Sequence, residues 1–444
     1  MRRKRKISRR KNQQGVIITL VAVFMLFVIG AMAALSIDVV TLYTARSEAQ
    51  LAADAAALAG ARVLANSGAT SDTSGASMTG AWSLAQAVAL QVAEQNTVGG
   101  VNLTQTQITL PAAPGGTNTN PTVTVSVQTN LPTFFARIWG TTHALVGASA
   151  TAEVYNPSGA TAVGLSTLPV APLCVKPWLL PNLDPRAGGT SIFNPDGSIT
   201  DANLLGWTSG SGATRLSVAC AGGNCSTLPA PVPWKYYPGD STTASQPPPN
   251  PASFVPTPSA LPACAAGFNP YQQDIAGCFQ TPIACGSNPQ SYYTVLIDMS
   301  NDANRDLETA NAVNCFTHSS TNRGDSVNPA PIGGQSIQPP FEFIAGDDNP
   351  IPGLATNDVM VSDSLVTVPV FNSSTTAPTS PVQIIGFLQL FLNPRGDRAQ
   401  TGGLNAGKVQ TTVINMAGCG TGWTATPING NGASPVAVRL ISPP

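Results

Sequence analysis

The chain begins with an apolar stretch that dominates its hydrophobic pattern. Residues 15–37 carry no charged side chain and are rich in Val, Ile, Leu, Phe, Met and Ala. As a helix, this segment is long enough to cross a hydrocarbon core of roughly 30 Å, which takes about 20 apolar residues. Alanine-rich sequence follows, and no proline occurs between residues 16 and 110. Because alanine has the highest intrinsic helix propensity, we predict one long helix that ends near Asn66-Ser67-Gly68.

Small residues recur at helical spacing beyond the apolar span and mark one face of this helix. Arg46, Gln50 and Asp54 lie on roughly the opposite face, four residues apart, where they can form a weak polar ladder. The small face fits two interpretations: it packs on the chain's own domain, which we favour, or it lets a helix of another molecule approach closely. The stripe consists of Ala45, Ala49, Ala52, Ala56 and Ala59.

The pattern after this helix predicts shorter elements. Residues 80–96 place apolar side chains at helical spacing and predict a second helix. The period then changes to two: residues 101–110 alternate in part, 121–128 alternate cleanly, and 145–155 predict a third strand. Residues 131–139 predict a short helix or bend. Together these elements indicate a long helix, a short helix and a small antiparallel sheet.

The sequence beyond residue 155 is irregular, with few helical patterns and many Pro and Gly breaks. Residues 238–262 predict a solvated, partly polyproline loop. Short strands are predicted at 288–298, 359–371, 382–392 and 409–416, with Gly386 interrupting the third of these. The predicted fold class is α+β. The predicted division is a basic tail (1–14), a transmembrane anchor (15–37), a helix and β-meander domain (38–155) and an exported β-rich domain (160–444).

One pattern in the N-terminal region resembles a known family. The pattern is a basic start, Gln14-Gly15, the apolar span, Asp38, Tyr43, Arg46, Gln50 and the run Ala52-Ala53-Asp54-Ala55-Ala56-Ala57-Leu58-Ala59-Gly60-Ala61. It is similar to the start of TadG/TadE-like proteins of bacterial tight-adherence (Flp-type) pilus assembly, over residues 10–65 and more loosely to about residue 155. The resemblance implies a pilin-like helix and sheet, a role in envelope-anchored assembly or secretion, and no catalytic residue in this region.

The chain departs from the family pattern at one position. Type IV prepilins and TadE-type pseudopilins carry Glu at the fifth position after the Gly at which they are processed. In this chain Leu20 stands five positions after Gly15. The pattern therefore does not favour cleavage by a prepilin peptidase.

Charge is distributed unevenly and predicts a topology. Short basic flanks stay in the cytoplasm, so we expect a single pass through the bacterial inner membrane with the body outside and with membrane lipid as a partner. Without the eight N-terminal cations the chain has 13 basic against 22 acidic residues, which argues against nucleic acid as a partner. A cleaved signal peptide is the alternative, because Ala31-Met32-Ala33 resembles a cleavage site. The cations are Arg2, Arg3, Lys4, Arg5, Lys6, Arg9, Arg10 and Lys11.

All eight cysteines lie beyond residue 170, in the part predicted to be exported. An even number in an oxidising compartment predicts disulfides, whose connectivity the sequence leaves open. Zinc is the alternative, but the closest cysteine pairs are not two residues apart as in common zinc ribbons, and the chain has only two histidines. The candidates are Cys174, Cys220, Cys225, Cys264, Cys278, Cys285, Cys315 and Cys419.

Motifs for catalysis and for cofactors are scarce. No HExxH, CxxC, GxGxxG, P-loop or GxSxG pattern occurs. His318 near Cys315 suggests a Cys/His nucleophile, although we favour a bridged Cys315. Asp298, Ser300 and Asp302 resemble the start of the metal site of the von Willebrand A domain that some TadG-like proteins carry. We interpret them as a capped turn, since Asp302 replaces a Ser and an EF-hand would need Gly and Glu at 303 and 309, so no metal or cofactor is predicted.

These observations predict a non-enzymatic, membrane-anchored structural component of a Tad-like pilus or secretion apparatus. Its expected partners are other pilus-assembly or secretion proteins, with copies of itself as a further option. The alternative is an anchored extracytoplasmic binding or adhesion protein whose β-rich body holds a ligand or a cell-wall component. An exported hydrolase ranks last.

Overall fold

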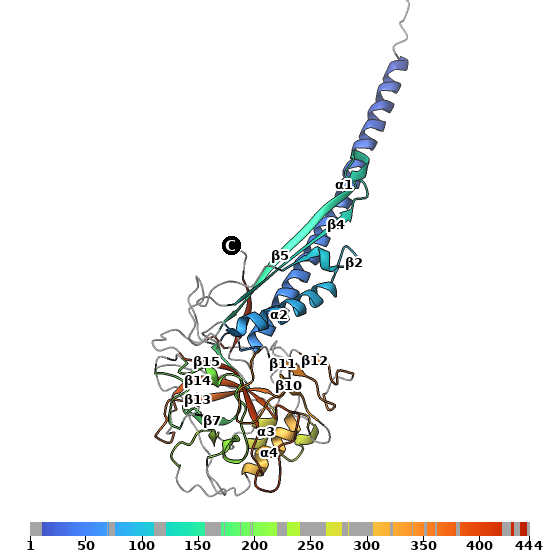
Figure 1. Cartoon of the computed structure of the whole chain (residues 1–444). Helices are drawn as coiled ribbons and strands as arrows, with labels where there is room; N and C mark the ends of the chain where they lie inside the picture. Colours follow the sequence, from blue (N-terminus) through green and yellow to red (C-terminus); the bar gives the residue numbers. More distant parts are fainter. Residues whose placement is uncertain are drawn as a thin grey trace, which may run out of the picture.

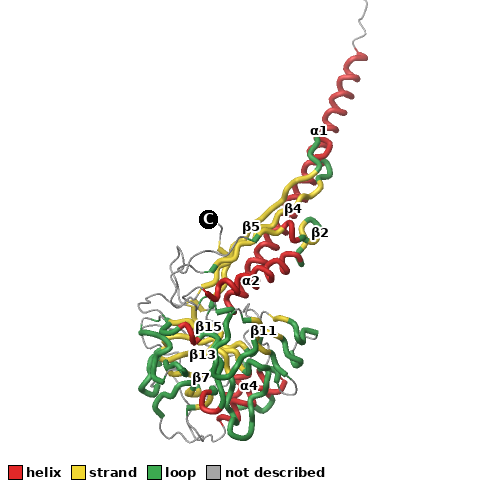
Figure 2. Tube along the Cα trace, in the orientation of Figure 1, coloured by secondary structure: helices red, strands yellow, loops and turns green. Residues whose placement is uncertain are grey.

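The chain forms a long stalk with a compact body at one end (Figure 1 and Figure 2). The stalk is built on helix α1, and the body is built around a six-stranded sheet. The computed structural model describes residues 11–68, 70, 76–110, 121–155, 170–172, 174–186, 188–195, 197, 199–219, 229–239, 263–277, 283, 305–319, 323–339, 341–349, 353–359, 362–378, 382–419, 428–429 and 436–441.

Helix α1 (Lys11–Asn66) is the central element of the stalk. It ends where the breaker Asn66-Ser67-Gly68 was predicted to end it. Gly68 has a left-handed φ of +81° and faces Leu205 and the carbonyl oxygen of Ile414, so a side chain at this position would be strained and crowded. The chain turns here into helix α2 (Ala76–Glu94), which packs along α1. A Cβ on Gly60 would lie 3.0 Å from the carbonyl oxygen of Ala85, so glycine allows the two helices to approach this closely.

A four-stranded antiparallel sheet covers the other side of α1, in the order β17-β5-β4-β3. The alternation predicted around residues 121–128 is present: Val123, Val125 and Val127 are buried against the helix, and the side chains between them are half-buried. The strands are β3 (Ile108–Thr109), β4 (Thr122–Pro132), β5 (His143–Tyr155) and β17 (Ala437–Ile441), with the 3-10 helix η2 (Ala136–Trp139) at the β4–β5 turn.

Residues 101–110 differ from the single strand expected there. Strands β1 (Thr97–Val98) and β2 (Val101–Asn102) form a separate two-stranded ribbon, and the 3-10 helix η1 (Gln105–Gln107) divides β2 from β3. A capping box between Thr104 and Gln107 favours this short helix over a continuous strand.

The fourth strand of the stalk sheet comes from the far end of the sequence. Strand β17 pairs antiparallel with β5, with Leu440 opposite Ala152. The Nε of Arg439 in β17 donates a hydrogen bond of 2.8 Å to the buried Glu153 of β5, and a terminal nitrogen of the same guanidinium forms an ion pair with this carboxylate at 2.7 Å. The division of the chain at residues 155–160 remains a prediction, and part of the range 160–444 belongs to the sheet of the stalk.

The body is organised around a mixed sheet in the order β15-β14-β13-β7-β9-β8. Every side chain of β14 and β15 is buried, because apolar clusters cover both faces of the sheet. Gly386 does not interrupt β14, contrary to the prediction; a Cβ there would lie 2.5 Å from the ring of Phe193, which packs on the strand at this point. The strands are β7 (Trp178–Pro181), β8 (Ser217–Val218), β9 (Lys235–Pro238), β13 (Leu365–Phe371), β14 (Ile384–Leu392) and β15 (Thr411–Gly418).

Two helices in the body were not predicted, α3 (Pro270–Ala276) and α4 (Arg305–Phe316), which pack on each other. The predicted strand 359–371 is divided between β12 and β13. The predicted strand 288–298 and most of the Pro-rich loop 238–262 lie outside the described residues. The remaining elements are β6 (Val170–Ala171), β10 (Ser326–Asn328), β11 (Glu342–Ile344), β12 (Asp358–Val359), β16 (Ile428–Asn429), η3 (Ala202–Leu204), η4 (Gly212–Thr214) and η5 (Ala263–Ala265).

Candidate assembly surface

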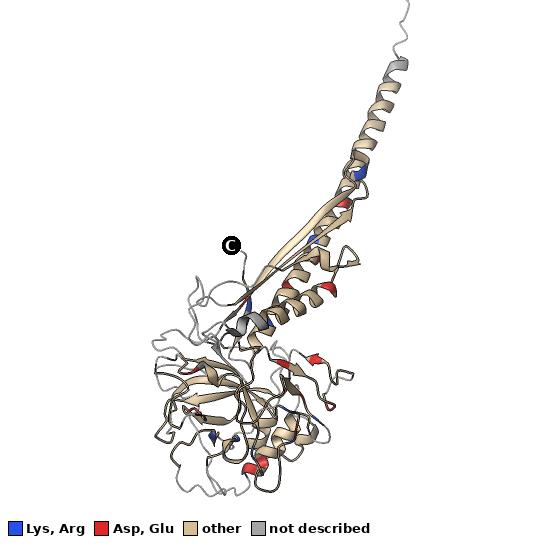
Figure 3. Cartoon of the chain, viewed as in Figure 1, with Lys and Arg blue, Asp and Glu red and all other residues tan. Residues whose placement is uncertain are grey.

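The first part of α1 projects beyond the rest of the chain (Figure 1). No side chain from residue 16 to residue 37 is buried, and this part of the helix carries no charge (Figure 3). At 1.5 Å per residue the segment is roughly 33 Å long. It is therefore long and apolar enough to cross a membrane.

From residue 16 onward, Asp38 is the first buried residue of α1, and it binds the tip of the β4–β5 hairpin to the helix. Its carboxylate accepts hydrogen bonds from the backbone N–H groups of Phe134 (2.9 Å), Phe135 (3.0 Å) and Ala136 (2.7 Å). Burial raises the pKa of Asp38, but these three hydrogen bonds and the charge of Arg137 outweigh it, so the pKa lies below its ordinary value. An ionised Asp38 thus holds the start of η2 against the helix.

A second carboxylate of α1 acts in the same way further along the stalk. Glu48 accepts a hydrogen bond of 2.7 Å from the backbone N–H of Gly99, in the turn between β1 and β2. Gly99 has a left-handed φ of +63°, which a glycine adopts without strain.

The alanine stripe faces the chain's own domain. Ala45, Ala49, Ala52 and Ala56 are buried in one cluster with side chains of α2, β4 and β5, and Ala59 is half-buried. Their small side chains let the sheet and α2 lie close to α1. These alanines are therefore not available to a helix of another molecule in this conformation.

The opposite face of α1 is open to solvent and carries the polar ladder. Gln50 donates a hydrogen bond of 2.8 Å to Asp54, as the spacing predicted, and a longer one of 3.4 Å to the carbonyl oxygen of Ser149. Leu51 lies on this face with 64 % of its surface exposed. An exposed leucine on a helix with few charges is a candidate contact for a partner helix.

The body is held at the end of α1. Asn415 of β15 donates hydrogen bonds to the carbonyl oxygen of Ala65, which lies in the last turn of α1, and to Gln389 of β14. Carbonyl groups at the end of a helix lack a partner within the helix, so this contact satisfies one of them and fixes the body on the stalk.

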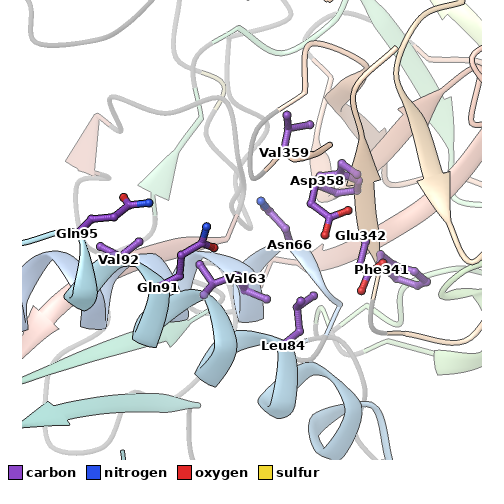
Figure 4. A pocket seen from close by; sticks show the side chains of 12 residues that line it. Val63, Asn66, Leu84, Gln91, Val92, Gln95, Phe341, Glu342, Asp358 and Val359 are labelled. Carbon is purple, nitrogen blue, oxygen red and sulfur yellow. The ribbon is translucent and has the colours of Figure 1, made fainter. Parts of the chain in front are cut away.

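A cavity of about 250 Å³ lies beside this junction (Figure 4). Side chains of α1 and α2 line one side of it, and residues 341–343 and 358–359 line the other. Glu342 and Asp358 give it an acidic edge, whereas the helix side is apolar apart from Asn66 and two glutamines. The labelled residues are Val63, Asn66, Leu84, Gln91, Val92, Gln95, Phe341, Glu342, Asp358 and Val359.

The described cysteines are all in disulfides. Cys264 and Cys315 form a bridge that links η5 to α4, and Cys174 and Cys419 each take part in a disulfide. Cys315 is therefore not the free thiol that a Cys/His nucleophile requires. Cys220, Cys225, Cys278 and Cys285 lie outside the described residues.

Of the other polar residues considered from the sequence, the structure describes His318. His318 pairs with Asp363 at 2.8 Å, and this hydrogen bond raises the pKa of the imidazole. Asp298, Ser300 and Asp302 lie outside the described residues, while Asp306 stands in the first turn of α4. Among the described residues no group of three His, Cys, Asp or Glu side chains is placed to hold a metal ion.

The sequence of nearly all of α1 matches one protein family. A family described as putative Flp pilus-assembly TadE/G-like matches residues 15–63. The chain has a TadE/G-like N-terminal region. No curated protein and no solved structure matches the chain.

The TadE/G-like region covers the exposed apolar span, Asp38, Glu48 and the alanine stripe. It ends just before the turn at Gly68, so α2, the stalk sheet and the body lie outside the match. Asp38, Tyr43 and the alanine run indicate this region in the sequence, but the sequence does not indicate what Asp38 and Glu48 bind, because their partners are backbone N–H groups.

Proposed function

We propose that the protein is a non-catalytic structural component of a Tad-type (Flp) pilus or of a related secretion apparatus, anchored in the bacterial inner membrane. Residues 15–37 cross the bilayer with the basic tail in the cytoplasm, and the rest of α1 carries the body outside. The partners are other pilus-assembly proteins.

The observation that supports this proposal most directly is the form of α1. One uninterrupted helix, nearly all of it in the TadE/G-like region, runs from an apolar span of membrane length through the stalk, and the body is attached at its far end. A tether would need only the span. A stalk stiffened by a second helix and a sheet instead sets the body at a fixed distance from the membrane.

The proposal is tested by recovering the full-length protein from membranes of its own bacterium. We expect pilus-assembly proteins to co-purify, and loss of the gene to reduce surface pili. Recovery of the protein without any assembly protein, together with normal piliation in the deletion strain, would refute the proposal.

A matched pair of substitutions tests the role of the stalk's open face. Leu51→Glu alters the exposed leucine of the TadE/G-like helix, and Leu404→Glu alters a leucine of the body that is 94 % exposed. We expect Leu51→Glu to lower the recovery of partners and Leu404→Glu to leave it unchanged. Equal recovery with both variants would place the partner contact elsewhere.

The cavity beside the α1–body junction favours a second candidate function, binding of a small ligand by an anchored extracytoplasmic protein. Its volume of about 250 Å³ is below the range of roughly 300–1,000 Å³ that is typical of small-molecule sites. We therefore rank this function second.

A further inference from the structure

The tip of the β4–β5 hairpin exposes large apolar side chains. Phe134, Ile138 and Trp139 are 62 %, 73 % and 60 % exposed, and Leu145 is exposed beside them at the start of β5. An Arg, Arg137, lies exposed among them. Soluble surfaces rarely gather an aromatic pair and an isoleucine within six residues without a partner.

The position of this tip along α1 indicates what covers it. The tip is held at Asp38 by three hydrogen bonds, and the exposed apolar segment of α1 ends at residue 37. Figure 1 shows the hairpin running alongside α1 up to the point where the helix projects alone. If residues 16–37 fill the hydrocarbon core, the tip lies at its outer boundary.

We propose that the hairpin tip is a second membrane contact, with Phe134, Ile138 and Trp139 inserted among the lipid headgroups and upper acyl chains of the outer face of the same bilayer that holds α1. Tryptophan favours this boundary because its large ring is apolar while the indole N–H is polar, and the apolar side chains of Phe134 and Ile138 favour the acyl chains.

The neighbouring residues have the chemistry that this position requires. Arg137 can extend its guanidinium toward lipid phosphates while its stem stays among apolar groups. The hairpin from residue 121 to residue 152 contains no acidic residue that anionic headgroups would repel. On α1 itself, Val39, Val40 and Tyr43 remain exposed after Asp38, so the helix presents the same kind of surface at this level.

Two attachment points would give the stalk a fixed tilt. A single helix can rotate and tilt in a bilayer, and interfacial aromatic and basic anchors are among the features that restrict these motions. The hydrogen bonds from Asp38 make the tip and the helix one rigid unit, so insertion of the tip orients the stalk and the body.

The test uses the full-length protein in vesicles of phosphatidylcholine and phosphatidylglycerol, with tryptophan emission quenched by brominated phosphatidylcholine. We compare wild type with Trp139→Phe, which keeps an aromatic ring at the tip. The control is Trp82→Phe, because Trp82 is buried in α2. That helix packs at Gly60, which is roughly 33 Å further along α1 than Asp38.

We expect bromine near the headgroup to quench a component of the wild-type emission that Trp139→Phe lacks and Trp82→Phe keeps. Bromine near the end of the acyl chains should quench this component less. Thermal unfolding of Trp139→Phe in detergent should match wild type, and Trp82→Phe should remain folded at the temperature of the quenching measurement. The proposal is overturned if Trp139→Phe and wild type lose the same amount of emission, because Trp139 would then face water or another protein.

Discussion

At the scale of single residues, two buried charged groups are stabilised in different ways. Asp38 is held in its charged form by three backbone N–H groups. Lys176, in the body, donates hydrogen bonds to the carbonyl oxygens of Ile275 (2.6 Å) and Gly277 (3.1 Å), and its Nζ lies 3.7 Å from the centroid of the Phe316 ring. Burial lowers the pKa of Lys176 to about 7, although Asp363 and Asp274 favour its charged form.

The lowered pKa of Lys176 predicts a pH-dependent stability. In the unfolded chain the lysine keeps its proton up to its ordinary pKa of about 10.4, so between that value and about 7 the unfolded state binds more protons. The free energy of unfolding should therefore rise with pH in this window, by at most about 1.4 kcal/mol per pH unit from this group. We expect Lys176→Met to flatten the rise, measured by denaturant unfolding from about pH 8 to about pH 10.

Lys408→Met is the matched control, since Lys408 also donates to a backbone carbonyl, that of Leu404, but at the surface. The free energy of unfolding of Lys408→Met should rise with pH as steeply as that of wild type. A slope that Lys176→Met leaves unchanged would mean that Lys176 remains protonated in the folded body throughout this range.

Sequence alone indicated the position of Asp38 but not its role. The family-like pattern marked it as the polar residue that closes the apolar span. Its partners are 96–98 residues away in the chain and are backbone groups, which leave no signature in residue type. Cys315, in contrast, could be assigned to a disulfide, because an even number of cysteines in a region that is predicted to be exported favours disulfides.

At the scale of elements, periodicity was informative wherever one face is buried. The end of α1, the helix after it and the alternation in β4 follow directly from the spacing of small and apolar residues. The body was harder to predict, since β14 and β15 are buried on both faces and show no alternation. Helix α4 had a usable signal that was missed: Ala310 and Val313, three residues apart, are both buried, with Asp306 and Glu308 in the first turn.

The packing of the alanine stripe predicts the effect of larger side chains. Ala52 and Ala56 are fully buried against the sheet and α2, so leucine at both positions would overfill the space between them. Each substitution should cost about 1–3 kcal/mol, without any loss of helix propensity. We expect the double variant Ala52→Leu with Ala56→Leu to unfold at lower temperature and to be cut faster by protease within the stalk.

The control places two leucines on the exposed face, as Thr44→Leu with Ser47→Leu. This variant should unfold like wild type in detergent. If the double variant at Ala52 and Ala56 proved as stable as the double variant at Thr44 and Ser47, the tight packing of the stripe would be contradicted.

At the scale of the whole molecule, the stalk depends on both ends of the described chain. Strand β17 covers the outer edge of β5, and the Arg439 guanidinium pairs with the buried Glu153. Breaking a buried pair can cost about 3–5 kcal/mol, and the cost should be smaller here because the Arg439 side chain is 31 % exposed. The pairing of β17 with β5 could not be predicted, since the sequence of a five-residue strand does not indicate which distant strand it pairs with.

Removal of residues 436–444 should therefore weaken the stalk and leave the body folded. We expect new protease cleavage sites within residues 121–155, identified by mass spectrometry, while the Cys264–Cys315 bridge and the body fragment persist. Removal of residues 442–444 alone retains β17 and should give the wild-type pattern. Identical cleavage in both truncated proteins would show that β17 does not protect the sheet.

The place of β17 in the sequence also has a consequence for biogenesis. The edge of β5 is made early, but the strand that covers it is synthesised only after the entire body. Until then the edge presents unpaired N–H and C=O groups, which another extended chain can bind. Until the body has been synthesised, the edge of β5 in a newly made molecule can therefore pair with a strand of a chaperone. It can also pair incorrectly with a strand of a neighbouring copy.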